Sequence, residues 1–254
     1  MAPTAVQAPP TPSAPPTVAN GSVATSRVHL LGAFELWFGD ELVELPQSAQ
    51  RLLAFLALHD RPLQRSFVSG SLWLDTTDQR ASANLRSTLW RLRRPGFDPI
   101  DSSITHLSLG SSVVVDLCEG TLLARRLVDC ADEADGEHLR GATTGPLATD
   151  LLPDWLDDDF VLVEQERWRQ LRIHALESLA RRMAATERFG EAIDAALAAI
   201  AAEPLRESAH RTLISVHLAE GNSSEARRSY VRFRDLLQRE LGLAPSETME
   251  RLLS

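Results

Sequence analysis

Apolar positions along residues 78–94 recur at helical spacing and predict a helix with two different faces. At 3.6 residues per turn, one arc of about 100° gathers apolar side chains and one threonine. These residues are Ala81, Leu85, Thr88, Leu89 and Leu92. The opposite edge is polar, at i, i+4, i+7, i+11 and i+14 spacing, and consists of Arg80, Asn84, Ser87, Arg91 and Arg94. We therefore predict that the apolar stripe faces a core and that the polar edge faces outward.

The same helix is strongly basic. Arg86 and Arg93 lie on its flank, and no acidic residue occurs between Arg80 and Arg94. Arginines without a counter-charge on one helix are typical of proteins that contact nucleic-acid phosphates. A solvated basic face on an ordinary surface helix is the alternative, and it is the commoner case for a helix taken alone. The neighbouring elements must decide between the two interpretations.

The segment before the basic helix predicts a small sheet followed by two helices. Turn residues, proline positions and apolar runs set the boundaries. The predicted order is a strand over 27–38, a turn at Gly39-Asp40, a strand over 41–45, a helix that starts at Pro46 and ends before 59–62, a short helix over 66–73, and a loop over 74–77. Asp78 can cap the basic helix that follows.

A hairpin is predicted after the basic helix. Pro95-Gly96 breaks the chain, and strands over 104–109 and 113–117 flank the turn Gly110-Ser-Ser. Strands, three helices and a terminal hairpin describe a winged helix, in which the third helix enters the major groove and the hairpin contacts the backbone. Because the basic helix occupies the third position, this order favours the nucleic-acid interpretation.

From Thr121 onward every strong pattern is helical. The predicted helices lie near 121–133, 137–147, 158–186, 189–202, 205–220, 223–241 and 246–254. Glu191-Ala192 and Glu225-Ala226 recur 34 residues apart, and Leu179 and Ala184 match Leu213 and Leu218 at the same offset. This period is typical of tetratricopeptide-like stacking, which buries a shared core and often offers a concave protein-binding surface. A purely structural helical domain is the alternative.

These patterns predict a mainly α fold with three parts. Residues 1–26 form a Pro/Ala-rich tail without a charged side chain, which we expect to be disordered. Residues 27–117 form an α+β winged helix-turn-helix that binds DNA. Residues 118–254 form an all-α, tetratricopeptide-like domain.

Charge is spread unevenly between the two predicted domains. The net charge is −9. Residues 27–117 hold 9 Arg against 10 Asp and Glu, a balance of −1, and residues 118–254 hold 17 Arg against 25, a balance of −8. The acidity belongs to the second half, so it does not argue against nucleic acid as a partner of the first.

Composition also excludes several classes of enzyme. All 26 basic residues are arginine, and the absence of lysine excludes a Walker A loop, a kinase-type lysine and a Schiff base. Cys118 and Cys130 are too few for a zinc site, and no HExxH or GxSxG run occurs. We therefore predict no enzyme, no catalytic or metal-binding residue and no cofactor. Neither an apolar run of 18 residues nor a signal peptide is found, so a cytoplasmic location is expected.

Residues 27–254 resemble the streptomyces antibiotic regulatory protein family, in which an OmpR-like winged helix precedes a bacterial transcriptional activator domain. The resemblance rests on six stretches, which are 85–94, 151–153, 164–167, 204–208, 218–221 and 240–246. It implies a transcriptional activator of the short form. Such a protein binds direct repeats in double-stranded promoter DNA, with a dimer on the DNA, and recruits RNA polymerase, often for secondary-metabolite (antibiotic biosynthesis) genes.

Two features depart from the family pattern. Trp90 stands where members usually carry a small polar residue, and the wing segment 106–113 contains no arginine. Trp90 could pack on the wing, stack against sugar or obstruct docking. These departures favour a rival interpretation, a protein-interaction module whose degenerate winged helix lacks useful DNA affinity.

Residue types suggest separate roles on the basic helix. Arg91 and Arg94 can present a planar fork to guanine or clamp a phosphate, Asn84 can pair with adenine, and Ser87 can contact either. The remaining arginines suit phosphate contacts, and these are Arg80, Arg86 and Arg93.

The loop before the basic helix suits a protein partner. Residues 74–79 are acidic and contain no arginine, so DNA phosphates would repel the loop and a basic surface of polymerase would attract it. The candidate polymerase contacts are Asp75, Thr76 and Thr77.

Overall fold

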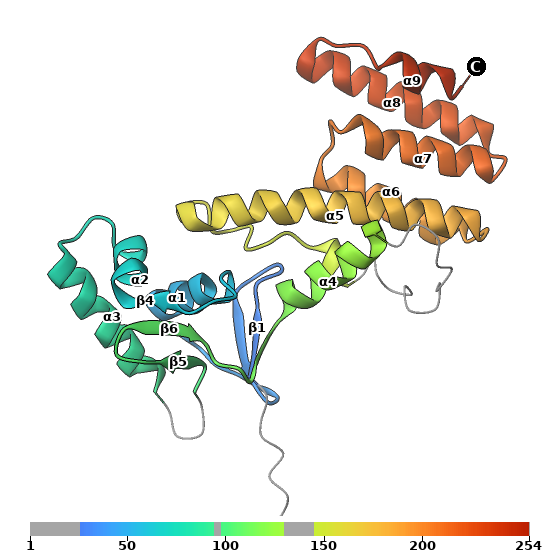
Figure 1. Ribbon diagram of the computed structural model, residues 1–254. Helices are drawn as coiled ribbons and strands as arrows, with labels where there is room; N and C mark the ends of the chain where they lie inside the picture. Colours follow the sequence, from blue (N-terminus) through green and yellow to red (C-terminus); the bar gives the residue numbers. More distant parts are fainter. Residues whose placement is uncertain (1–25, 94–97, 130–144, 254) are drawn as a thin grey trace, which may run out of the picture.

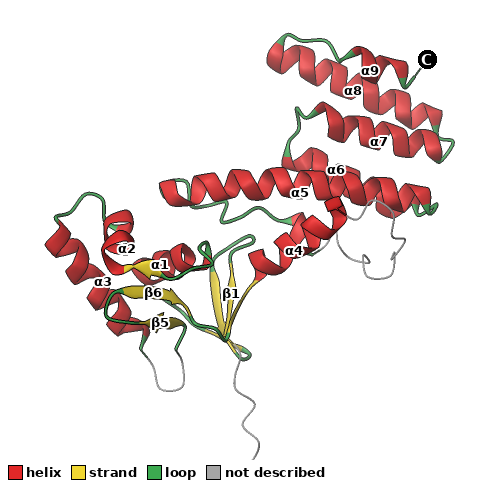
Figure 2. Cartoon of the chain, in the orientation of Figure 1, coloured by secondary structure: helices red, strands yellow, loops and turns green. Residues whose placement is uncertain are grey.

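Two small sheets and three helices form the first part of the molecule, and a stack of helices forms the second (Figures 1 and 2). The computed structural model describes residues 26–93, 98–129 and 145–253. The first part contains β1 (Ser26–His29), β2 (Glu35–Phe38), β3 (Glu41–Leu42), α1 (Gln47–Ala57), β4 (Leu63–Gln64), α2 (Arg65–Leu72), α3 (Asp78–Leu92), β5 (Ile100–Ser102), β6 (His106–Leu109) and β7 (Val113–Val115). The second contains α4 (Asp116–Asp129), the 3₁₀ helix η1 (Pro146–Ala148), α5 (Asp159–Ala185), α6 (Phe189–Ala202), α7 (Glu207–Ala219), α8 (Ser223–Leu241) and α9 (Glu247–Arg251).

The first sheet has the strand order β3-β2-β1-β7. β1 pairs antiparallel with β2 and parallel with β7. The single strand predicted over 27–38 is thus two strands, because the chain reverses between His29 and Glu35. The strand predicted over 41–45 is shorter and comprises only Glu41–Leu42.

The second sheet has the order β4-β6-β5 and contains the wing. The hairpin predicted from 104–109 and 113–117 is wrong, because β6 pairs with β5 instead and β7 joins the first sheet. Gly110 makes this divergence possible. Its N–H donates to the Pro99 carbonyl at 2.9 Å, and a Cβ at this position would lie 2.9 Å from the Asp98 carbonyl oxygen. The chain is therefore held beside the start of β5, and β7 continues across the core to β1.

α4 begins at Asp116, directly after β7, and not near residue 121 as predicted. The Asp116 carboxylate accepts hydrogen bonds from the backbone N–H groups of Leu30 and Leu31 at 2.8 and 3.1 Å. This side chain ties the start of the helical part to the end of β1. Most of the helix predicted over 137–147 lies outside the described residues.

The later helices stack in chain order (Figure 1). α5 packs on α4, α6 and α7, and α7 packs on α6 and α8. The 34-residue repeat corresponds to two successive helix pairs, α5–α6 and α7–α8. Ala192 and Ala226 are fully buried at equivalent positions, and Leu179 and Leu213 are buried as well. None of the helices in the described ranges combines the length and the apolar character needed to cross a membrane.

The two parts share one hydrophobic core. Val28, Leu52 and Leu85 from the first part belong to the same buried cluster as Trp168 and Leu176 from the second. Because no polar layer separates them, the helical stack covers apolar surface that the winged helix would otherwise expose.

Side chains and backbone cross this junction. The Leu152 N–H donates to the Leu30 carbonyl at 2.9 Å, which extends β1 toward the helical part. Arg51 of α1 forms an ion pair with Asp158 at the start of α5, with nitrogen and oxygen 2.7 Å apart. The rings of Phe55 and Phe160 meet edge to face, with centroids 5.1 Å apart.

Close packing of α4 on α5 gives a stability prediction. A Cβ at Gly120 would lie 2.9 Å from both Pro146 Cβ and Trp168 Cη2, and Trp168 cannot easily move because its Nε1 donates to the Thr149 carbonyl at 2.9 Å. We expect Gly120→Ala to lower the free energy of unfolding by about 1–3 kcal/mol. The matched control is Gly70→Ala in α2, where nothing lies within 4 Å; it should be neutral or stabilising by up to about 1 kcal/mol. Urea unfolding measures both, and equal effects would contradict the packing assigned to Gly120.

Candidate nucleic-acid interface

The apolar stripe predicted for residues 78–94 is confirmed. Ala81, Leu85, Thr88 and Leu92 are 2–3% exposed, and Leu89 is half-buried. α3 packs with this face on α1 and α2. Burial of the stripe fixes the rotation of the helix, so the polar edge must face outward.

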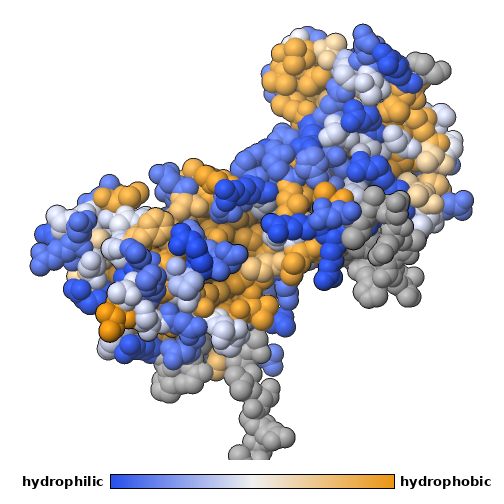
Figure 3. All heavy atoms as spheres, viewed as in Figure 1, coloured by the Kyte–Doolittle hydropathy of each residue, from blue (hydrophilic) through white to orange (hydrophobic). Residues whose placement is uncertain are grey.

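The polar edge of α3 is exposed over its described length. This holds for Arg80, Asn84, Ser87 and Arg91 of the edge, and Arg86 and Arg93 on its flank are exposed as well. Arg93 is the C-terminal cap of the helix, and Arg94 lies outside the described residues. Figure 3 shows mostly hydrophilic side chains over the end of the molecule that carries α3.

The arginines of this edge carry charge that the rest of the described chain does not neutralise. The guanidinium groups of Arg80, Arg86, Arg91 and Arg93 form no ion pair or hydrogen bond with another described residue. Several arginines of the helical part, in contrast, are paired with carboxylates, as Arg228 is with Glu225. An unpaired guanidinium at the surface can bind an external anion without first breaking an internal contact.

Thr77, and not Asp78, caps α3. The Thr77 side chain accepts a hydrogen bond from the Arg80 N–H, and Asp78 is already the first helical residue. The prediction for Asp78 was wrong by one position, because either side chain can satisfy a free N–H at a helix start. Asp78 still lies in the first turn, where its charge is favourable with the helix dipole.

The loop between α2 and α3 offers one free acidic group. Asp75, Thr76 and Thr77 are all exposed. Thr76 Oγ1 donates to the Trp73 carbonyl at 3.1 Å, and Thr77 caps the helix, so both hydroxyls serve the loop itself. Asp75 makes no polar contact with another described residue and is the loop's available charge.

Arg65, which sequence patterns did not single out, holds the wing in place. Its Nη1 donates to Ser102 Oγ and to the Ser103 carbonyl at 2.9 and 2.8 Å, and its backbone N–H donates to the Thr105 carbonyl at 2.9 Å. The tip of the wing is apolar, since Ile104 is 95% exposed. A long-range contact of this kind leaves no periodic signal in the sequence.

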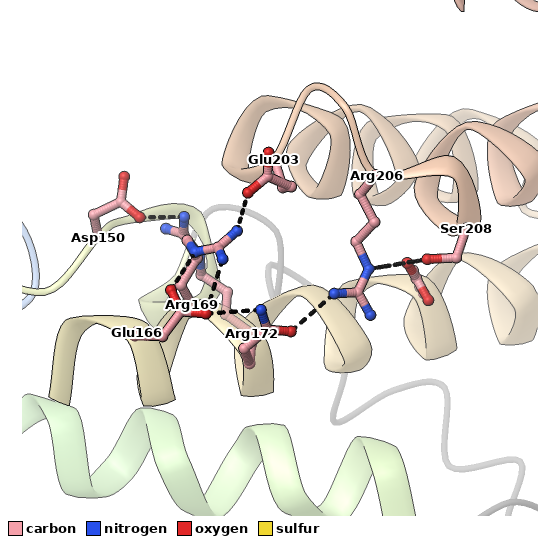
Figure 4. A network of polar contacts seen from close by, with 9 residues as sticks. Asp150, Glu166, Arg169, Arg172, Glu203, Arg206 and Ser208 are labelled. Atoms are coloured by element: carbon pink, nitrogen blue, oxygen red, sulfur yellow. Dashed lines mark hydrogen bonds and ion pairs between the residues drawn. The ribbon is translucent and has the colours of Figure 1, made fainter. Parts of the chain in front are cut away.

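The helical part contains a network of paired charges that crosses several elements (Figure 4). Arg172 is buried on α5 and pairs with Asp150, which lies in the segment before α5. Burial lowers the pKa of the Arg172 guanidinium, and Asp150 opposes this shift. Arg169 joins Glu166 on its own helix to Glu203 at the end of α6.

Arg206 completes this network from the loop before α7. It donates to Gln170 and Ser208 at 2.9 Å each and reaches the Glu177 carboxylate at 3.3 Å. The stretch 204–208 therefore fastens α7 to α5, and we assign it a structural role.

Two observations concern metal binding and thiol chemistry in the described part of the chain. No group of three or more His, Cys, Asp or Glu side chains within the described ranges could hold a metal ion. Burial and the carboxylates of Asp60, Asp116 and Glu119 raise the pKa of the Cys118 thiol. A thiol with a raised pKa is a poor nucleophile at neutral pH.

Comparisons with known proteins agree with this architecture. Residues 136–254 match the family described as the bacterial transcriptional activator domain. The chain is 28% identical over 239 residues to the regulatory protein AfsR of Streptomyces coelicolor, with 89% of this chain and 24% of that protein covered. The chain thus spans about a quarter of the length of this curated relative.

A solved structure shares the fold. Mycobacterium tuberculosis EmbR, in complex with a low-affinity phosphopeptide, superposes with a TM-score of 0.74 at 21% sequence identity. The match covers 91% of this chain and 64% of that chain. The predicted fold class, a winged helix followed by a helical domain, is confirmed.

The fold is thus a winged helix joined to a helical domain, and residues 136–254 match the bacterial transcriptional activator domain. The domain match and the similarity to these two regulators support the resemblance to the streptomyces antibiotic regulatory protein family that the sequence motifs indicated.

Proposed function

We propose that this chain is a sequence-specific DNA-binding activator that places α3 in the major groove of promoter direct repeats, pairs as a dimer on the DNA, and recruits RNA polymerase. One observation supports this most strongly. The third helix of a winged helix presents four exposed arginines that no other described residue neutralises. The match to the bacterial transcriptional activator domain and the similarity to a Streptomyces regulatory protein support a promoter as the target, and a secondary-metabolite gene cluster as the regulated set.

Position on α3 separates base readout from backbone contact. Asn84, Ser87 and Arg91 follow one exposed edge, and their side chains suit the edges of adenine or guanine. Arg80, Arg86 and Arg93 suit phosphates on either side of the groove. We propose that Arg94 takes one of these two roles, a contact with a guanine edge or a contact with a phosphate.

The rival proposal is a protein-interaction module without useful DNA affinity. A wing without arginine and the exposed Trp90 favour it. The tetratricopeptide-like stacking that we propose for α5–α8 would supply a surface for the partner. The unpaired arginines of α3 oppose it, because a protein-binding helical domain does not need them.

DNA binding should depend steeply on salt. If about five arginines per protomer neutralise phosphates, log Kd should change with log salt by about 0.9 per contact, or roughly 4.5 for each protomer bound. Fluorescence anisotropy with a promoter duplex measures the slope over a range from about 50 to about 300 mM salt, in which the Debye length falls by more than half. An affinity that does not change with salt would contradict the phosphate contacts.

Arg91→Ala should weaken promoter binding by about 1–3 kcal/mol if Arg91 reads a base. The side chain is exposed, so far-ultraviolet circular dichroism and the melting temperature should not change. The matched control is Arg181→Ala, which removes an exposed arginine from α5 of the helical part and should leave DNA affinity intact. Equal losses in both variants would show that only net charge matters.

Asp75→Arg should keep promoter affinity but reduce transcription, because it reverses the one free charge of the α2–α3 loop that we propose contacts polymerase. Asp40→Arg, at the exposed turn between β2 and β3, is the control and should activate normally. Gel-shift and in-vitro transcription assays on the same preparations compare them. Full activation by Asp75→Arg would place the polymerase contact elsewhere, for example on the helical part.

A further inference from the structure

A cleft of about 270 Å³ separates the C-terminal half of α3 from the wing. Arg86, Trp90 and Arg93 line it from α3, and Ile100 and Ser102 line it from β5. Arg65 also lines the cleft and fixes the position of Ser102 through its hydrogen bond. The cleft is therefore a shaped space between the two elements that face DNA in a winged helix.

Trp90 is the unusual member of this cleft, because 75% of its surface is exposed. Its indole N–H has no hydrogen-bond partner among the described residues, unlike Trp37, which donates to Glu35 at 2.8 Å, and Trp168, which is buried. Large aromatic side chains gain free energy when a partner covers them, and tryptophan combines an apolar ring with one polar atom. An exposed indole beside a cleft favours a ligand that is partly apolar.

The charges of the cleft favour an anionic ligand. Three guanidinium groups line it, from Arg65, Arg86 and Arg93, against one carboxylate, from Asp98. Arg65 is engaged with the wing, whereas Arg86 and Arg93 make no ion pair within the described part of the chain. A ligand that satisfies the whole cleft carries a phosphate for these two arginines and an uncharged ring for the indole.

We propose that this cleft binds one sugar–phosphate unit of the DNA backbone, with Trp90 packed against the deoxyribose and Arg86 and Arg93 paired with the phosphate. The inference rests on the proposed function. It gives Trp90 a role in binding DNA, whereas the alternative is that the side chain obstructs docking. It also accounts for a wing without arginine, because α3 supplies the charge and Arg65 only positions the opposite wall. A backbone contact carries no base information, so Trp90 should raise affinity without raising specificity.

The first test compares two duplexes of equal length, one with the promoter site and one with an unrelated sequence. Trp90→Ala should weaken binding of both by the same factor, about tenfold, which is the scale of one aromatic contact to a nucleotide. Trp90→Phe should retain most of the affinity because it keeps an apolar ring. DNA should change the tryptophan fluorescence of the parent protein but not that of Trp90→Phe, although both bind.

A double-mutant cycle tests whether Trp90 and Arg86 hold the same unit. Trp90→Ala combined with Arg86→Gln should be non-additive, whereas Trp90→Ala combined with Arg80→Gln should be additive, since ten residues place Arg80 about 15 Å away along the helix. Additive losses in both cycles would overturn the shared subsite.

The outcomes separate this inference from the proposed function. If the parent protein binds neither duplex, both fail. If the parent binds but Trp90→Ala binds equally well, the cleft inference alone fails. A loss confined to the promoter duplex would show that Trp90 reads bases, which also contradicts a backbone subsite.

Discussion

The Asp116 carboxylate is the contact on which the arrangement of the two parts depends. It accepts the N–H groups of Leu30 and Leu31 while its own residue begins α4. Leaving such partly buried donors unsatisfied costs about 1–3 kcal/mol each. Because β7 ends at Val115, no linker separates the sheet from the helical stack. The position of α3 relative to the activator helices is thus set by a strand, a helix start and two hydrogen bonds.

Arginines are used differently on the two sides of this junction. In the helical part, arginines such as Arg169 and Arg206 bind side chains of neighbouring helices and hold these helices together. On α3 the arginines face outward, and the described chain offers them no carboxylate. Arginine therefore stabilises helix packing in the helical part, whereas on α3 it is available to bind an external anion. An overall acidic protein can in this way present a basic surface, as the charge balance of −1 for residues 27–117 allowed.

Periodicity in the sequence was sufficient to predict the helical parts of the fold. The buried stripe from Ala81 to Leu92 follows from helical spacing within one segment. The equivalent burial of Ala192 and Ala226 follows from the 34-residue repeat. The wing could not be predicted in the same way, because alternation in β6 and β7 does not say which strand each one joins. Arg65 and the cleft around Trp90 depend on contacts between distant segments, so the charge pattern alone pointed only to the arginines of α3.

If the exposed edge of α3 selects particular DNA sequences, the protein should enrich those sequences from genomic DNA. Purified full-length protein is incubated with sheared DNA from its own genome, and the retained fragments are sequenced. We expect enriched fragments upstream of genes that share a repeated motif, and loss of that enrichment when Asn84 and Arg91 are both replaced by alanine. Retention of fragments without any common motif, or the same motif from the double variant, would contradict it.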